Sequence, residues 1–460
     1  MERLEGSDAI LWHLESNTAM HTLKVLVIDP ARRGTPLTLD DVQRVIEANI
    51  DRYPRARQKV VTPLVRFHGR PYWVEVRGAL DVRRHLDERQ AVAPGGRRQF
   101  DAVLADLAER PLPLDRPLWH ITLLHGLEGG RQALVCQIHH AITDGSAAAA
   151  AFEGLTSAEA GGAPEMPLLP APPPTERSLL STATRQVPRW LGAGPQVARA
   201  AAESNRRAAA YRVVSEHLPP AGLSQFRDTF LIKSRFGRQR VCATASLPLA
   251  DFQQVSRWAG VTLNGALHGV LAGALRSERL RRGEDVSEPL SAAFGIALDD
   301  PDAPPRRWGN NVTPTYVLLH SNEADPVERL RRTAASAKEG VELRRAAGHD
   351  AMTHVSHHTP RLPGAFMRTL KDVVPTPAHL VTANVRGPAT NRWLGDCEVV
   401  DWYSFAIIVP PLPVNLTVYS YAGRMNFGLL SEPGTFPHPY PFLDDIASEL
   451  DGLVALSREP

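Results

Sequence analysis

Two histidines, an aspartate and a glycine stand close together in the segment His139-His140-Ala141-Ile142-Thr143-Asp144-Gly145. An imidazole has an ordinary pKa of about 6.5, so it can accept and return a proton near neutral pH. An ionised carboxylate such as Asp144 is better suited to ordering a loop or ring. The segment therefore predicts a catalytic centre in which one histidine acts and the aspartate orders the site.

A buried strand is expected directly before this segment, because residues 133–138 are apolar and follow the turn at Gly129-Gly130. Side chains on a strand alternate between its two faces. One face then carries Leu134, Cys136, Ile138 and His140, and the other carries Val135, Gln137 and His139. Only one histidine can face a cleft, and its neighbour packs or hydrogen-bonds behind the strand. Residues 146–152 are expected to begin a helix with Asp144 near its N-terminus, where the helix dipole favours a carboxylate.

Three other interpretations of the segment compete with this one. Histidines at strand ends are often satisfied core residues. A metal site is disfavoured because adjacent strand residues diverge, no Cys-x-x-Cys pair occurs, and the distant His354 and His358 lack a metalloprotease glutamate. A serine hydrolase is disfavoured because Ser146 has no Gly-x-Ser-x-Gly frame. The combination of all seven residues favours the catalytic interpretation, with no metal.

Composition narrows the class of protein. At 460 residues the chain is long enough for two domains, and 43% hydrophobic with 22% charged residues is typical of a folded protein. The net charge of +2 gives no reason to expect nucleic acid as a partner. Cys136, Cys242 and Cys397 are odd in number and widely spaced, which favours a reducing, cytoplasmic location. Met1–Thr18 has no secretory pattern and no window is long and apolar enough for a spanning helix, so any membrane contact is expected to be peripheral.

Proline and helix signals divide the chain into three parts. Residues 1–163 are expected to form an α/β domain that contains the histidine segment. Residues 164–226 begin with a proline-rich stretch and continue as helical segments, so they are expected to be a linker. Residues 227–460 show a second alternation of strands and helices, beginning with a strand at Thr229–Ile232. Both domains are therefore expected to have helices layered on a mixed sheet.

The linker combines basic and apolar side chains within 179–218. The arginines are Arg185, Arg189, Arg199, Arg206, Arg207 and Arg212, and the apolar or aromatic residues beside them are Trp190, Leu191, Val197 and Tyr211. Such a stretch can lie on a lipid surface. A solvated helix packed on a domain explains the same pattern.

An ordered set of blocks resembles the bacterial wax ester synthase/acyl-CoA:diacylglycerol acyltransferase family, within the CoA-dependent acyltransferase superfamily. The resemblance covers nearly the whole chain. The blocks are Leu4–Glu15 with Met20-His21, Pro113–Trp119, His139–Gly145, Trp308–Asn311, Asp325–Leu330, Asn384–Pro388 and Ser420–Arg424. The histidine motif alone is typical of the whole superfamily, and the ordered set of blocks narrows the resemblance to this family.

The resemblance implies an α/β fold of two chloramphenicol-acetyltransferase-like domains with mixed sheets and a tunnel at their interface. It implies that His140 is the general base, that His139 supports the strand, and that Asp144 pairs with an arginine that the sequence does not identify. Gly145 and Asn264 would support the site. The implied substrates are acyl-CoA and a long-chain alcohol or diacylglycerol, with no cofactor, no covalent acyl-enzyme, and a possible membrane or lipid-droplet surface as partner.

Ala19 stands where the family usually has proline, and two further departures from the family pattern matter most. Gly265 follows Asn264 where the family usually has aspartate, and Arg386 stands where the family usually has proline. Gly265 weakens a helix by about 1 kcal/mol relative to alanine, which indicates either close packing or drift. Both departures bear on the choice of substrate. Two other functions stay open: esterification of a polyketide or other specialised metabolite, and lipid binding without catalysis.

Overall fold

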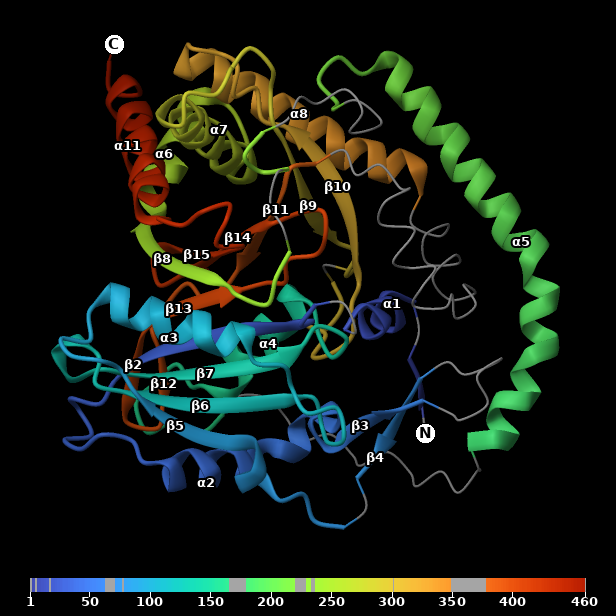
Figure 1. The fold of residues 1–460 in the computed structure, drawn as a ribbon, viewed down its shortest axis with the longest axis vertical. Coiled ribbons are helices and arrows are strands. Elements are labelled where there is room, and N and C mark those ends of the chain that lie inside the picture. Colours follow the sequence, from blue (N-terminus) through green and yellow to red (C-terminus); the bar gives the residue numbers. More distant parts are fainter. Residues whose placement is uncertain are drawn as a thin grey trace.

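Two six-stranded mixed sheets, one from each half of the chain, lie one above the other in the computed structural model (Figure 1). The structure describes residues 2–4, 6–15, 18–62, 71–76, 78–164, 179–219, 229–232, 236–300, 302–348 and 378–459. A small third sheet joins β1 (Glu2–Arg3), β4 (Tyr72–Glu75) and β3 (Gln58–Val61). The predicted α/β class with mixed sheets is confirmed.

The first sheet carries the strand that leads to the two histidines. Its order is β12-β13-β2-β7-β6-β5, and its strands are β2 (His21–Asp29), β5 (Leu86–Gln90), β6 (Trp119–His125), β7 (Gln132–His139), β12 (Arg392–Leu394) and β13 (Cys397–Phe405). The strand expected before the histidines is present as β7, which pairs antiparallel with β6. One face packs on α2 (Leu39–Asn49) and α4 (Gly145–Leu155), and the other packs on α3 (Arg97–Glu109).

Two strands of this sheet come from the far end of the chain. β13 pairs antiparallel with β2, and β12 pairs with β13. The sequence places residues 392–405 in a C-terminal domain, whereas in the structure these two strands belong to the first sheet. Buried Val399, Trp402 and Phe405 explain the exchange, because their side chains complete the cores on the two faces of the first sheet.

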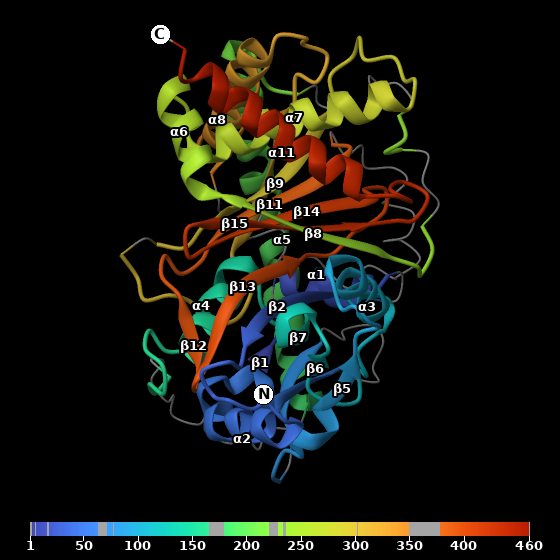
Figure 2. The ribbon, with the colours of Figure 1, turned by 90° about the vertical axis from the view of Figure 1, so that its left-hand side faces the viewer.

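The second sheet has the order β10-β9-β11-β14-β15-β8. Its strands are β8 (Val241–Pro248), β9 (Ser291–Ala297), β10 (Val312–Leu318), β11 (Leu380–Arg386), β14 (Val414–Tyr421) and β15 (Arg424–Ser431). Helices α6 (Leu249–Ala259), α7 (Leu263–Arg281), α8 (Pro326–Ala347) and α11 (Tyr440–Leu456) cover the face turned away from the first sheet (Figure 2). The opposite face is left to meet the first half of the molecule.

The helix caps agree with the sequence. Thr38 closes a capping box with Asp41 at the start of α2, and Thr262 caps α7 through the Gly265 amide at 3.0 Å. The strand expected at Thr229–Ile232 is wrong, because these residues form a turn in which the Ile232 amide donates to the Thr229 carbonyl. Phe230 is buried in the core of the second half, so burial without strand pairing explains that apolar run.

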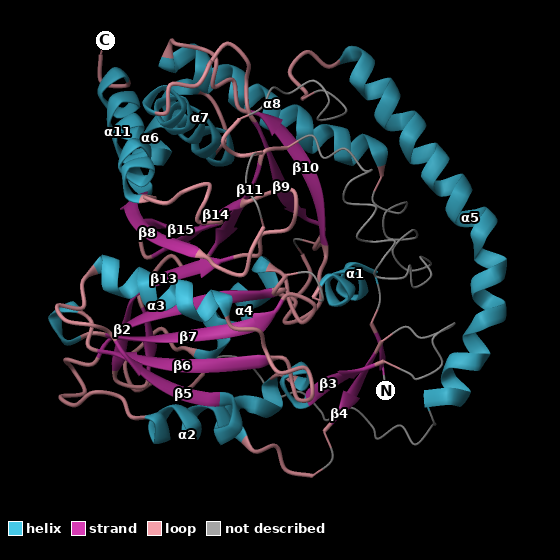
Figure 3. Ribbon diagram, in the orientation of Figure 1, coloured by secondary structure: helices cyan, strands magenta, loops and turns pink. Residues whose placement is uncertain are grey.

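A long helix, α5 (Leu179–Val214), runs along one side of the molecule past both halves (Figures 1 and 3). The Tyr211 hydroxyl donates to Glu342 on α8 at 2.7 Å, and Arg206 and Arg207 both pair with Glu203. The structure describes the backbone but not the side chains of five residues considered on this helix: Arg185, Arg189, Trp190, Leu191 and Val197. No helix in the described part of the chain has both the length and the apolar composition of a membrane span.

Candidate active site

His140 lies one residue past the end of β7 and lines a cavity between the two sheets. Its backbone amide donates to the Met20 carbonyl at 2.6 Å, which ties the strand end to the segment before β2. The cavity has a volume of about 420 Å³. Its walls come from β2, from the turn that begins α4, and from β9, β10, β11 and β14. The sheets of both halves therefore enclose the side chain of His140.

His139 points away from this cavity and is fully buried. Its Nδ1 accepts a hydrogen bond from the Ala141 amide at 3.0 Å, and its Nε2 lies 3.3 Å from the Glu15 carboxylate. The Trp12 ring packs 5.7 Å from the imidazole, centroid to centroid. The strand alternation thus separates the two imidazoles, and His139 is held by contacts behind the strand.

Asp144 caps α4 and anchors the segment on its other side. Its Oδ1 accepts from the Ala147 amide at 2.9 Å. Its Oδ2 accepts from the Arg306 guanidinium at 2.6 Å and from the Asn311 amide at 2.9 Å. Arg306 is therefore the arginine partner that the sequence leaves unidentified, and Asp299 also pairs with it at 2.9 Å. Both carboxylate oxygens of Asp144 are thus occupied by contacts that hold the turn in place.

The Trp308–Asn311 block contacts both the histidine motif and the N-terminal part of the chain. Gly309 and Thr143 form a β-bridge. The Asn310 side-chain amide donates to the His140 carbonyl at 2.6 Å and to Asp8 Oδ1 at 2.8 Å. Burial raises the pKa of Asp8 to about 6. Three blocks that lie about 130 to 300 residues apart in the sequence thus meet at Asn310.

Gly145 and Asn264 occupy different positions relative to the cavity. Gly145 lines it, its carbonyl accepts from the Tyr419 hydroxyl at 2.7 Å, and an added Cβ would come within 2.9 Å of Val385. Asn264 does not line the cavity, and its side chain accepts a hydrogen bond from the Asn384 side chain at 3.4 Å. Asn384 itself lines the cavity. The structure therefore brings Gly145 to the site and places Asn264 behind Asn384.

The two departures from the family pattern have separate locations. A Cβ at Gly265 would lie 2.8 Å from the Cβ of Ala334 on α8, so the glycine permits close packing of α7 and α8. Arg386 is exposed at the end of β11. Close packing, not drift, accounts for Gly265.

The electrostatics favour a neutral imidazole at His140. Burial lowers the pKa of His140 below its usual value, and the ammonium of Lys24 acts in the same direction. A neutral imidazole is the form that can accept a proton. His140 is therefore in the state that a general base requires near neutral pH.

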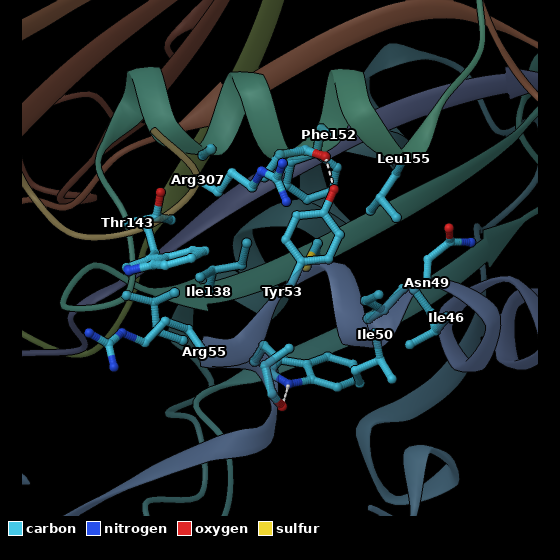
Figure 4. Close-up of a pocket in the computed structure, with 18 residues that line it drawn as sticks. Ile46, Asn49, Ile50, Tyr53, Arg55, Ile138, Thr143, Phe152, Leu155 and Arg307 are labelled. Atoms are coloured by element: carbon cyan, nitrogen blue, oxygen red, sulfur yellow. Dashed lines mark hydrogen bonds between the residues drawn. The ribbon is translucent and has the colours of Figure 1, made fainter. Parts of the chain in front are cut away.

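A second, smaller pocket of about 110 Å³ lies on the other side of the turn and is drawn in Figure 4. Thr143 lines it, together with apolar residues of α2, β6, β7 and α4. The Tyr53 hydroxyl donates to the Ala151 carbonyl across it (Figure 4). Trp119 forms part of the wall and fixes its indole by donating to the Ala56 carbonyl at 2.9 Å.

Sequence reasoning missed two charged residues near His140. Arg306 lies just before the Trp308–Asn311 block, and this proximity is the one signal that points to it. Lys24 sits in an apolar strand sequence, where a lysine facing the core breaks the pattern. His354 and His358, considered above as metal ligands, lie outside the described residues.

The fold is shared with a known class of protein, the condensation domains. The first condensation domain of the calcium-dependent antibiotic synthetase has a similar structure, with a TM-score of 0.58, 14% identity, and coverage of 100% of this chain and 97% of that one. Condensation domains have the two-domain fold of chloramphenicol acetyltransferase. The predicted fold is therefore confirmed.

The chain belongs to the wax ester synthase/diacylglycerol acyltransferase family and is an O-acyltransferase. Residues 4–267 match the family's catalytic domain, and residues 308–453 match its C-terminal domain. A Mycobacterium tuberculosis protein named as a diacylglycerol O-acyltransferase is 33% identical over 454 residues, covering 96% of this chain and 93% of that protein. The wax ester synthase/diacylglycerol acyltransferase from Marinobacter aquaeolei VT8 aligns with a TM-score of 0.69, 20% identity and coverage of 99% and 100%.

Proposed function

We propose that this protein transfers a fatty acyl group from acyl-CoA to the hydroxyl of a long-chain alcohol or diacylglycerol, with His140 as the general base. The observation that carries the proposal is the place of His140, whose imidazole enters a largely apolar cavity enclosed by both sheets. An apolar cavity suits lipid chains, and a neutral imidazole suits removal of a hydroxyl proton.

The proposed reaction needs no covalent acyl-enzyme. The acceptor oxygen forms a bond to the thioester carbon while its proton moves to the imidazole of His140. The tetrahedral intermediate then collapses, the C–S bond breaks, and the imidazolium returns the proton to the CoA thiolate. A positioned base of this kind contributes roughly 100- to 10,000-fold in rate. Holding both substrates in one cavity supplies further acceleration.

Asp144 and Arg306 act in this proposal as positioning residues. Asp144 is buried and holds both the first turn of α4 and the loop that carries Asn310. Asn310 in turn fixes the carbonyl of His140. The ion pair thereby sets the orientation of the base without taking part in proton transfer.

We place the far end of the acyl chain in the pocket of Figure 4. That pocket is apolar, and Thr143 in its wall is the neighbour of Asp144 in the wall of the main cavity. A chain whose thioester lies beside His140 can therefore extend past the turn into it. The side chains facing this space from α4 then influence the preferred chain length.

The test is a product assay with purified full-length protein. Labelled palmitoyl-CoA is incubated with hexadecanol, diacylglycerol and a panel of less common alcohols, and both CoA release and ester are measured. Ester that depends on hexadecanol or diacylglycerol supports the proposal, and His140→Ala should abolish it while the protein stays folded. Ester with unusual alcohols only would indicate a specialised metabolite as acceptor. Absence of CoA release would indicate lipid binding without catalysis.

Peripheral contact with a membrane or lipid-droplet surface is a further part of the proposal, based on the basic and apolar residues of α5. Arg199, Arg206 and Arg207 are exposed on it, which suits an anionic lipid surface. Hydrogen exchange in residues 179–214 should slow when anionic liposomes are added. Unchanged exchange there, with normal ester synthesis, would contradict this contact.

A further inference from the structure

Lys24 brings a buried ammonium group to the cavity that contains His140. The residue lies on β2 and is only 3% exposed. Its Nζ donates to the Ser404 hydroxyl on β13 at 2.7 Å and lies 5.4 Å from the centroid of the Tyr419 ring. A lysine at this position departs from the apolar pattern of β2, where eight of nine residues are buried.

The charge of Lys24 has no dedicated counter-ion among the described residues. The carboxylate that acts on it electrostatically is Asp144, and both Asp144 oxygens are already engaged by Arg306 and by backbone amides. An ammonium carries three donors, and Ser404 takes one. A buried charge is costly unless it is paired, so proteins rarely keep one without a use.

The reaction proposed above produces negative charge inside this cavity. When the acceptor oxygen attacks, the electron pair of the carbonyl double bond moves onto the carbonyl oxygen. A preorganised cation in a water-poor site stabilises such an oxyanion far more than it would in water. Lys24 and His140 line the same cavity, and the charge of Lys24 acts on His140.

We propose that Lys24 is a further catalytic residue, which donates a hydrogen bond from its ammonium to the oxyanion of the tetrahedral intermediate. The proposal rests on the acyl-transfer function above. The C–O bond forms as the hydroxyl proton moves to His140, and the C–S bond breaks as His140 protonates the thiolate. Lys24 keeps all its protons throughout, so it stabilises charge and transfers none.

The protonation of Lys24 sets the alkaline limit of this role. Burial lowers the pKa of Lys24 to about 8, and the charge of Asp144 partly offsets that effect. The other titratable groups around it are His140, Cys136 on β7 and Tyr419 on β14. Burial raises the pKa of the Cys136 thiol to about 12 and raises the pKa of Tyr419 as well, so both stay neutral near pH 8. Activity should therefore fall as the pH rises through about 8 and Lys24 loses its charge.

The kinetic test compares Lys24→Met with Lys59→Met, a matched substitution on β3 outside the cavity. Lys24→Met should lower kcat by roughly 100- to 1,000-fold, the usual effect of removing one oxyanion donor, with KM changed by less than about threefold. Lys59→Met should keep wild-type kinetics. Lys24→Arg should retain part of the activity and move the alkaline limb upward, because a guanidinium stays charged. A near-normal kcat in Lys24→Met, or an alkaline limb unmoved in Lys24→Arg, would overturn the proposal.

A binding test separates this proposal from the proposed function, because it needs no turnover. A monoanionic alkylphosphonate ester with a hexadecyl chain mimics the tetrahedral oxyanion, and a long-chain ketone serves as the uncharged control ligand. Calorimetry at pH 7 should show at least tenfold weaker phosphonate binding to Lys24→Met than to wild type, with equal ketone binding. Equal phosphonate binding to both proteins would refute the role of Lys24. Lys24-dependent binding in a wild-type protein that forms no ester would instead refute the acyl-transfer function.

Discussion

The proposed reaction places on the side chain of His140 two requirements that ordinarily conflict. A base must reach the substrate, yet it must also stay neutral and fixed in orientation. The structure meets the first requirement by placing the imidazole at the cavity wall, and the second through burial and through the Asn310 contact to the His140 carbonyl. The neighbouring His139 does not line the cavity, and both of its ring nitrogens face protein groups.

The lowered pKa of His140 predicts the acid side of the pH profile. The neutral imidazole is the active form, so kcat/KM should stay level as the pH falls and drop only below the ordinary histidine value of about 6.5. The measurement is kcat/KM for ester formation between pH 4.5 and 7.5. An acid limb above pH 6.5 would contradict the assignment of His140 as a buried base.

Asp144→Asn should destabilise the protein by roughly 1 to 3 kcal/mol, because it removes the charge of a buried carboxylate, while the partly exposed Arg306 keeps its second partner Asp299. Asparagine caps helices as well as aspartate does, so the loss reports the contact with Arg306 and not the cap. The control is Asp325→Asn at the N-cap of α8, which is exposed and caps through two amides without an ion pair. Chemical denaturation of both variants checks the difference. Equal stability of the two variants would show that the ion pair contributes nothing.

At the scale of elements, local signals in the sequence were sufficient for many helices and strands. The Thr38 and Thr262 caps and the hairpin before His139 are encoded within a few residues of where they act. The exchange of β12 and β13, and the pairing of Asp144 with Arg306, join segments more than 100 residues apart. No periodicity reports such contacts, because a strand pattern does not say which sheet it joins.

Gly265→Ala should be destabilising although alanine favours helices. The new Cβ would meet Ala334 at 2.8 Å, and overpacking of this kind costs roughly 1 to 3 kcal/mol, more than the gain in helix propensity of about 1 kcal/mol. Gly452→Ala on α11 is the matched control, because no atom lies within 4 Å of its added Cβ. Thermal unfolding should therefore move in opposite directions in the two variants. A stabilised Gly265→Ala protein would contradict the packing argument.

Ala151→Leu on α4 should shorten the preferred acyl chain, because the larger side chain would fill part of the pocket in Figure 4. Activity with palmitoyl-CoA should fall relative to activity with octanoyl-CoA. Ala150→Leu places the same side chain on the same helix but outside both cavities, so it should leave the ratio of the two rates unchanged. An unchanged ratio in Ala151→Leu would place the acyl chain elsewhere.

At the scale of the whole molecule, the second half of the chain does more than contact the first half, because it contributes strands to the first sheet. β13 lies between β12 and β2 in the first sheet, although its residues follow most of the second half in sequence. The cavity wall and the support of His140 likewise draw on both halves. Among the strands that the structure describes, no single cut of the chain therefore leaves both six-stranded sheets with all their strands.

Residues 1–226 and 227–460 expressed separately should each fail to fold. The first fragment leaves β2 as an exposed edge without β13, and the second leaves the β12–β13 pair without β2. Co-expression of both fragments should restore soluble, active protein, which serves as the control. Solubility and thermal unfolding of each piece provide the measurement. A cooperative transition in residues 227–460 alone would show that the shared strands are dispensable.

The shared strand also has a consequence for the order of events on the ribosome. β2 is made early, but its neighbour β13 emerges only after residue 405 has been added. At typical synthesis rates of about 5 to 20 residues per second, that gap lasts roughly 20 to 75 s. The first sheet, which includes the strand that ends at His139, stays incomplete during this interval. For this protein the catalytic half is therefore completed after synthesis of nearly the whole chain.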